Sequence, residues 1–123
     1  QDNKITFLDF DYFGWDDPVK LTSDFYWHPG MKLRENHRMF WLDSMISIFS
    51  GEDPHFEKRL ESALPFYALR WILIILNEFL EKEQKRREYA RLTQACNWEE
   101  VKKSQLIKAL DLSSSLKRYI EKN

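Results

Sequence analysis

The chain has 123 residues, of which 43% are hydrophobic and 15% aromatic, and its 19 lysines and arginines almost balance its 20 aspartates and glutamates. This length fits one domain, and the balanced charge excludes a disordered polyelectrolyte and a strongly basic nucleic-acid binder. The single cysteine, Cys96, excludes an internal disulfide framework and a multi-cysteine zinc site. Three glycines and four prolines argue against a turn-rich all-β fold.

The ends of the chain and its apolar stretch bear on location. The chain opens on Gln1 rather than Met, so we expect a segment upstream, and its first residues do not resemble a signal peptide. The longest apolar stretch, 63–80, is interrupted by Pro65, Arg70 and polar residues. A central arginine is costly in a bilayer, so the sequence favours a buried core helix, no membrane contact and a cytoplasmic protein.

The first thirty residues differ from the rest in charge, because they hold six aspartates against two lysines. Within them, Ile5–Leu8 is short and apolar and predicts a strand that ends at Asp9. A turn around Gly14 follows, since glycine tolerates the backbone angles that turns require. We therefore expect residues 1–16 to form a strand or hairpin segment.

From Asp17 to the end, at 17–123, the sequence predicts helices. Asp17 is a good N-cap, Pro18 suits the first helical position, and Pro29-Gly30 ends this first helix. Asn36 is expected to cap a second helix that ends at Gly51.

The later helices have similar signals. Asp53-Pro54 predicts another helix start, and Pro65 is expected to kink that helix or separate it from the next. Phe66–Leu80 is apolar on nearly every face, which predicts the central and most buried helix. Asn97, with Glu100 three residues on, predicts the capped start of a last helix, whose serines at 113–115 favour fraying.

The candidate chemistry lies in the acidic head. Asp9 and Asp11 are two residues apart, so in an extended segment both carboxylates point to the same side. Paired carboxylates of this kind suit Mg²⁺, which takes one or two carboxylates together with substrate phosphates. Spacing alone leaves the alternative that these acids stabilise a turn.

A resemblance strengthens the metal interpretation. Residues 5–25 resemble the segment that follows the catalytic loop in aminoglycoside phosphotransferase and choline kinase-like small-molecule kinases. The matching features are Phe7-Leu8, Asp9-Phe10-Asp11, Gly14, Asp16-Asp17-Pro18 and Asp24-Phe25. Residues 60–80 are loosely similar to a C-terminal core helix of the same family.

The resemblance implies a kinase-like fold that uses ATP and Mg²⁺. Asp9 would be the aspartate that bridges the metal to the nucleotide phosphates, and Asp11 a second acid near the metal. Asp24 would brace the catalytic loop through backbone N–H groups, which is a structural role.

The chain departs from the family in what it lacks. It contains neither a catalytic loop of the form His-x-Asp-x-x-x-x-Asn nor an N-terminal lobe with the nucleotide-binding lysine. The resemblance thus implies a mainly α-helical C-terminal lobe, 1–123, of an ATP- and Mg²⁺-dependent phosphotransferase. The whole protein would phosphorylate a hydroxyl of a small molecule, and this part alone would be inactive.

Other functions remain open from the sequence. As an alternative to the phosphotransferase, the chain would be a non-catalytic helical interaction module. The basic run Lys82–Arg91 either contacts phosphate or RNA, or forms a helix face exposed to solvent. His37 with Glu35, and His55 with Asp53, are either metal ligands or surface residues. The aromatic segment 25–29, with Phe40-Trp41, belongs either to the core or to the wall of a substrate cleft.

Overall fold

The protein consists of helices in the parts of the chain that the structure describes, namely residues 14–83, 85 and 97–122 of a computed structural model. The helices are α1 (Pro18–Trp27), α2 (Glu35–Phe49), α3 (Phe56–Leu76), the short 3₁₀ helix η1 (Asn77–Phe79) and α5 (Trp98–Lys122). No strand occurs among these residues, which confirms the mainly α class. The predicted strand, Asp9 and Asp11 lie outside the described residues.

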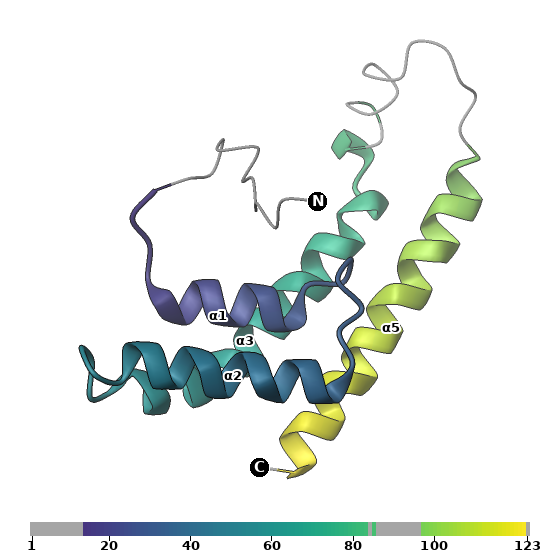
Figure 1. The fold of residues 1–123 in the computed structure, drawn as a ribbon. Helices are drawn as coiled ribbons and strands as arrows, with labels where there is room; N and C mark the ends of the chain where they lie inside the picture. Colours follow the sequence, from purple (N-terminus) through teal and green to yellow (C-terminus); the bar gives the residue numbers. More distant parts are fainter. Residues whose placement is uncertain (1–13, 84, 86–96, 123) are drawn as a thin grey trace, which may run out of the picture.

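The helices pack around α3, which makes the largest interfaces with α1 and with α5. Figure 1 shows α1 and α2 lying across one end of α3, while α5 runs alongside α3. The helix α5 contacts η1, and Tyr119 near its end contacts Trp27 of α1. Figure 1 shows α5 running in the direction opposite to α3.

The predicted start of α1 is confirmed. Asp17 is the N-cap, and one of its carboxylate oxygens accepts a hydrogen bond of 2.9 Å from the Val19 N–H. Pro18 occupies the first helical position, where its missing N–H costs no hydrogen bond.

Two predicted caps are wrong. The helix α2 begins at Glu35, after Arg34, which makes no side-chain cap, so Asn36 lies inside the helix. The helix α3 begins at Phe56 rather than after Asp53. The Asp53 carboxylate instead accepts a hydrogen bond from the His55 N–H and forms a turn ahead of the helix.

Pro65 neither breaks α3 nor separates it into two helices, because α3 is continuous from Phe56 to Leu76. Pro65 has no N–H to donate to the carbonyl of Glu61, so α3 forms there with one hydrogen bond fewer. Packing of the surrounding apolar side chains, such as Leu60 and Leu64, offsets that loss.

The prediction that Phe66–Leu80 is the most buried helix is wrong. Three of the five buried side chains of α3 lie in its first half, and Phe56 and Leu64 among them are 0% and 1% exposed. In the second half Ala68 and Ile75 are buried, whereas Phe66 and Leu73 are 70% and 66% exposed. Figure 1 shows the reason: the second half of α3 extends past α1 and α2, and α5 is the described helix beside it. An apolar sequence does not guarantee that neighbouring segments cover every face.

The last helix confirms its predicted start and contradicts the predicted fraying. The Asn97 side chain accepts a hydrogen bond of 3.4 Å from the Glu100 N–H, and α5 runs without interruption to Lys122. The Ser114 and Ser115 hydroxyls donate to backbone carbonyls four residues earlier, so both serines are accommodated inside the helix.

Among the residues that the structure describes, one segment, Phe56–Phe79, is long and apolar enough by length and composition to cross a membrane. A core helix of a globular protein satisfies the same criteria, and this segment contributes Phe56, Leu60, Leu64, Ala68 and Ile75 to the core.

The uneven burial of α3 gives a matched pair of variants. Leu64→Ala removes a fully buried side chain and should lower the free energy of unfolding by about 2–5 kcal/mol. Leu73→Ala is the same change on the same helix at a side chain that is two-thirds exposed. This variant should alter the free energy of unfolding by less than about 0.5 kcal/mol. Urea denaturation followed by circular dichroism measures both, and equal losses would contradict the assignment of the core.

Candidate functional site

The sequence-predicted site residues are only partly described. Asp9 and Asp11 lie outside the described residues, as do Cys96 and most of Lys82–Arg91. Within the described ranges, no three His, Cys, Asp or Glu side chains gather closely enough to hold a metal ion. The two histidine–acid pairs therefore acquire no third described ligand.

Asp24 lies on α1 and forms an ion pair with Arg70 of α3. Lys20, one turn earlier on α1, lies 3.7 Å from the second Asp24 oxygen and 2.6 Å from Asp16. Asp24 thus ties α1 to the middle of α3, beside the acidic end of the predicted motif. Its predicted role in bracing a catalytic loop stays a prediction.

Arg59 makes a second connection between these helices. Its guanidinium donates to Asp17 at 2.6 Å and to Asp53 at 2.7 Å, so one cation joins the start of α1 to the turn before α3. The hydrogen bond from Arg59, followed by that from the Val19 N–H, holds the pKa of Asp17 below its ordinary value. Because Asp17 directly follows the predicted metal-binding segment, Arg59 fixes where that segment joins the helices.

A cleft of about 680 Å³ lies between α2 on one side and α3 and α5 on the other. Its floor is aromatic, formed by Tyr26 and Trp27 from the end of α1 and by Tyr119 from α5. The ring centroids of Trp27 and Tyr119 are 5.8 Å apart and nearly perpendicular. Aliphatic side chains complete the walls: Met39, Leu42, Ile46, Leu60 and Leu64.

The phenol groups in the floor are held neutral. Burial, with the Glu35 carboxylate nearby, raises the pKa of Tyr26 to about 12. Burial also raises the pKa of Tyr119, helped by Glu61. Both rings therefore present an uncharged π surface to the cleft throughout the physiological pH range.

The cleft was partly foreseen from the sequence. The core interpretation of the aromatic segment 25–29 is confirmed for Tyr26 and Trp27, which are 4% and 1% exposed. Both also line this cleft, while the interpretation as the wall of a substrate cleft stays a prediction. Phe40 and Trp41 are not among the lining residues. The charged side chains of the cleft come from α2, α3 and α5, and no local motif brings them together in the sequence.

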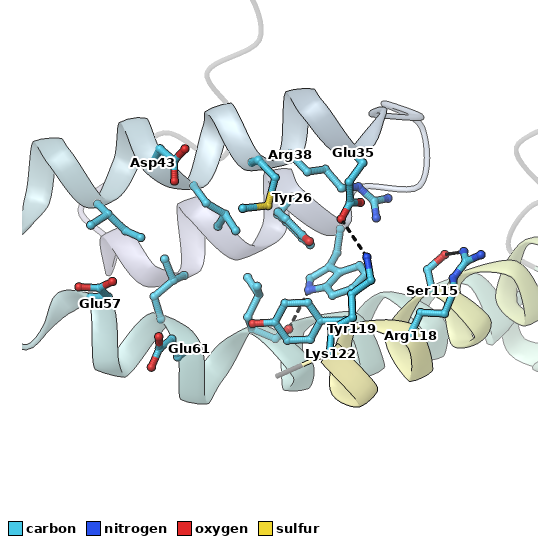
Figure 2. Close-up of a pocket in the computed structure, with 16 residues that line it drawn as sticks. Tyr26, Glu35, Arg38, Asp43, Glu57, Glu61, Ser115, Arg118, Tyr119 and Lys122 are labelled. Atoms are coloured by element: carbon cyan, nitrogen blue, oxygen red, sulfur yellow. Dashed lines mark hydrogen bonds and ion pairs between the residues drawn. The ribbon is translucent and has the colours of Figure 1, made fainter.

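Figure 2 shows that the charges of the cleft are divided between its ends. Three carboxylates lie toward one end: Asp43, Glu57 and Glu61. Three cations lie toward the other end: Arg38, Arg118 and Lys122, with Glu35 3.7 Å from Lys122.

Comparisons with protein-family models, curated proteins and solved structures give no match to this chain.

The pairing of Asp17 with Arg59 predicts a pH dependence. The folded protein lowers the pKa of Asp17 from 3.8, so this stabilisation is fully present above the unfolded pKa and is lost as pH falls through the folded pKa. The free energy of unfolding should therefore fall modestly below about pH 4, because both partners of this ion pair are partly exposed to solvent. Asp17→Asn, which keeps a good N-cap but loses the charge, should make that drop smaller.

Denaturation in urea at a series of pH values measures the effect. Asp111→Asn, an exposed carboxylate of α5, is the matched control and should leave the pH profile as in the parent protein. An Asp17→Asn profile that superimposes on the parent profile would contradict the role of this ion pair.

Proposed function

We propose that this chain is the C-terminal helical part of an ATP- and Mg²⁺-dependent phosphotransferase that phosphorylates a hydroxyl of a small molecule in the cytoplasm. The observation that carries the proposal is the order of residues over 5–25, from the apolar pair before Asp9 through Asp17-Pro18 to Asp24. In this proposal Asp9 binds Mg²⁺ and Asp11 assists, since a divalent ion bridging the nucleotide phosphates needs carboxylate ligands.

The structure supports the proposal at the junction between the motif and the helices. Asp17 caps α1, and Arg59 and Arg70 link Asp17 and Asp24 to α3. A segment entering at Asp17 is therefore anchored to α3 by two ion pairs at the surface. Such anchoring is what a metal-binding loop needs, because its carboxylates must hold a fixed geometry relative to the phosphates.

The exposed apolar surface of α3 agrees with the same proposal. Phe66, Leu69 and Leu73 are between 48% and 70% exposed, although side chains of this kind are usually buried. In a phosphotransferase, the remainder of the same protein, including the catalytic loop and the nucleotide-binding lobe, would provide the cover. The 123-residue chain alone would then have no phosphotransferase activity.

The second candidate function is a non-catalytic helical interaction module, and the same exposed residues favour it. The sequence encoded upstream of Gln1 discriminates between the two. A His-x-Asp-x-x-x-x-Asn loop within about 20 residues, with a lysine-bearing lobe before it, supports the phosphotransferase. A start codon close to Gln1 without such a loop supports the interaction module.

Asp9→Asn in the complete gene product tests the metal role directly. The variant should fold normally, lose Mg²⁺-dependent ATP binding in calorimetry, and lower kcat by about 100-fold or more, as when a charge-stabilising group is removed from an active site. Asp111→Asn, a matched exposed change on α5, should keep both properties. Unchanged Mg²⁺-ATP binding by the Asp9→Asn protein would overturn the assignment.

A further inference from the structure

The cleft between α2, α3 and α5 has the size and lining of a small-molecule site. Its volume of about 680 Å³ falls within the range of about 300–1,000 Å³ typical of ligand pockets. Such pockets combine apolar and aromatic walls with a few polar groups that orient the ligand. This cleft has that combination, and the motif at 5–25 does not involve it.

The basic end of the cleft is prepared for an anion. The guanidinium of Arg38 stacks over two rings of the floor, with its central carbon 5.2 Å from the Tyr26 centroid and 5.4 Å from the Trp27 centroid. This stacking holds the guanidinium at the aromatic floor, and Arg38 lines the cleft. A guanidinium held in one place offers an anion several N–H donors in a fixed arrangement.

Two cations from α5 lie at the same end. Arg118 and Lys122 are one turn apart on that helix and both line the cleft. Arg118 donates a hydrogen bond of 3.2 Å to the Ser115 hydroxyl, which restrains it. Glu35 is the carboxylate at this end, so three cations face one acid and a carboxylate would be attracted.

The acidic end is prepared for a cation. Glu57 and Glu61 are one turn apart on α3, and Asp43 lies across from them on α2 (Figure 2). None of the three forms an ion pair with another described residue. Arg59, the nearest arginine in sequence to Glu57, is already bound to Asp17 and Asp53. An ammonium group would supply the missing counter-charge.

We propose that this cleft binds a small zwitterion with a carboxylate at one end, an ammonium group at the other and an apolar body between them. The basic and acidic groups lie toward opposite ends of the cleft (Figure 2), so the ligand needs one charge at each end of its chain. An ω-amino acid has this arrangement and would place its carboxylate at the basic end and its ammonium at the acidic end. Its methylene chain would lie on the aromatic floor.

A ligand with one charge fits less well. An aliphatic anion would leave the carboxylates without a counter-charge and place apolar groups against them. An aliphatic amine would do the same to the three cations. Specificity therefore arises from both ends together, since the basic end disfavours a ligand without an anionic group and the acidic end one without a cationic group. This inference does not depend on the proposed phosphotransferase activity.

Calorimetry of the 123-residue chain with ε-aminocaproate tests the proposal, with caproate and hexylamine as analogues that carry one charge each. We expect ε-aminocaproate to bind at least about tenfold more tightly than either analogue, since each lacks one charge-assisted contact. In NMR spectra, binding should shift the indole N–H resonance of Trp27, which sequential assignment of the parent protein identifies. No saturable binding, or equal binding by one analogue, would overturn the proposal.

Variants of each end complete the test. Glu57→Gln/Glu61→Gln should weaken ε-aminocaproate binding about tenfold and leave caproate binding unchanged or stronger. Arg118→Gln/Lys122→Gln should weaken ε-aminocaproate but spare hexylamine. Glu52→Gln and Lys103→Gln, exposed changes outside the cleft, are the matched controls. Equal effects of the control and cleft variants, or identical responses of all three ligands, would contradict the two-ended site.

Discussion

The indole of Trp27, on α1, contacts each of the other three long helices described, and their arrangement depends on it. Trp27 ends α1 and donates a buried hydrogen bond of 2.8 Å to the Leu64 carbonyl of α3. Tyr119 of α5 packs edge-on against its ring, and Arg38 of α2 lies over it. A buried indole N–H without an acceptor would be costly, so this one hydrogen bond sets where α1 crosses α3.

The same contact explains why the cleft exists. Trp27 lies beside Leu64 of α3, and the Arg38 side chain of α2 stacks on the Trp27 ring. The contact of α2 with the rest of the fold at this point is therefore made through Arg38 and the aromatic rings. The described residues of α2 include none that is fully buried, and its interface with α3 is much smaller than that of α1. The space left between α2 and α3 is therefore open at the level of the aromatic floor.

Local sequence signals predicted local structure well. Asp17-Pro18 and Asn97 mark the starts of α1 and α5, because a cap is a contact between residues close in the chain. Asn36 and Asp53 failed as caps, since several positions near a helix start compete and tertiary packing selects among them. The prediction that the apolar run after Pro65 is buried failed for a related reason. Its composition is a local property, whereas its burial depends on which distant helices pack against it.

The candidate sites divide along the same line. The acids of the motif are neighbours in sequence, so a resemblance over 5–25 is enough to propose roles for them, which stay predictions. The ends of the cleft combine Asp43 with Glu57 and Glu61, and Arg38 with Arg118 and Lys122, which only the packing of three helices brings together. A search for local spacing has no signal for such a set.

The uneven burial of α3 also links the stability of this chain to its surroundings. In the chain alone, Phe66 and Leu73 remain mostly exposed to water, so they contribute little hydrophobic free energy to folding. Any molecule or segment that covers them binds the folded state in preference to the unfolded state. By mass action, the melting temperature then becomes a function of that partner's concentration, so stability measured on the chain alone is a lower limit.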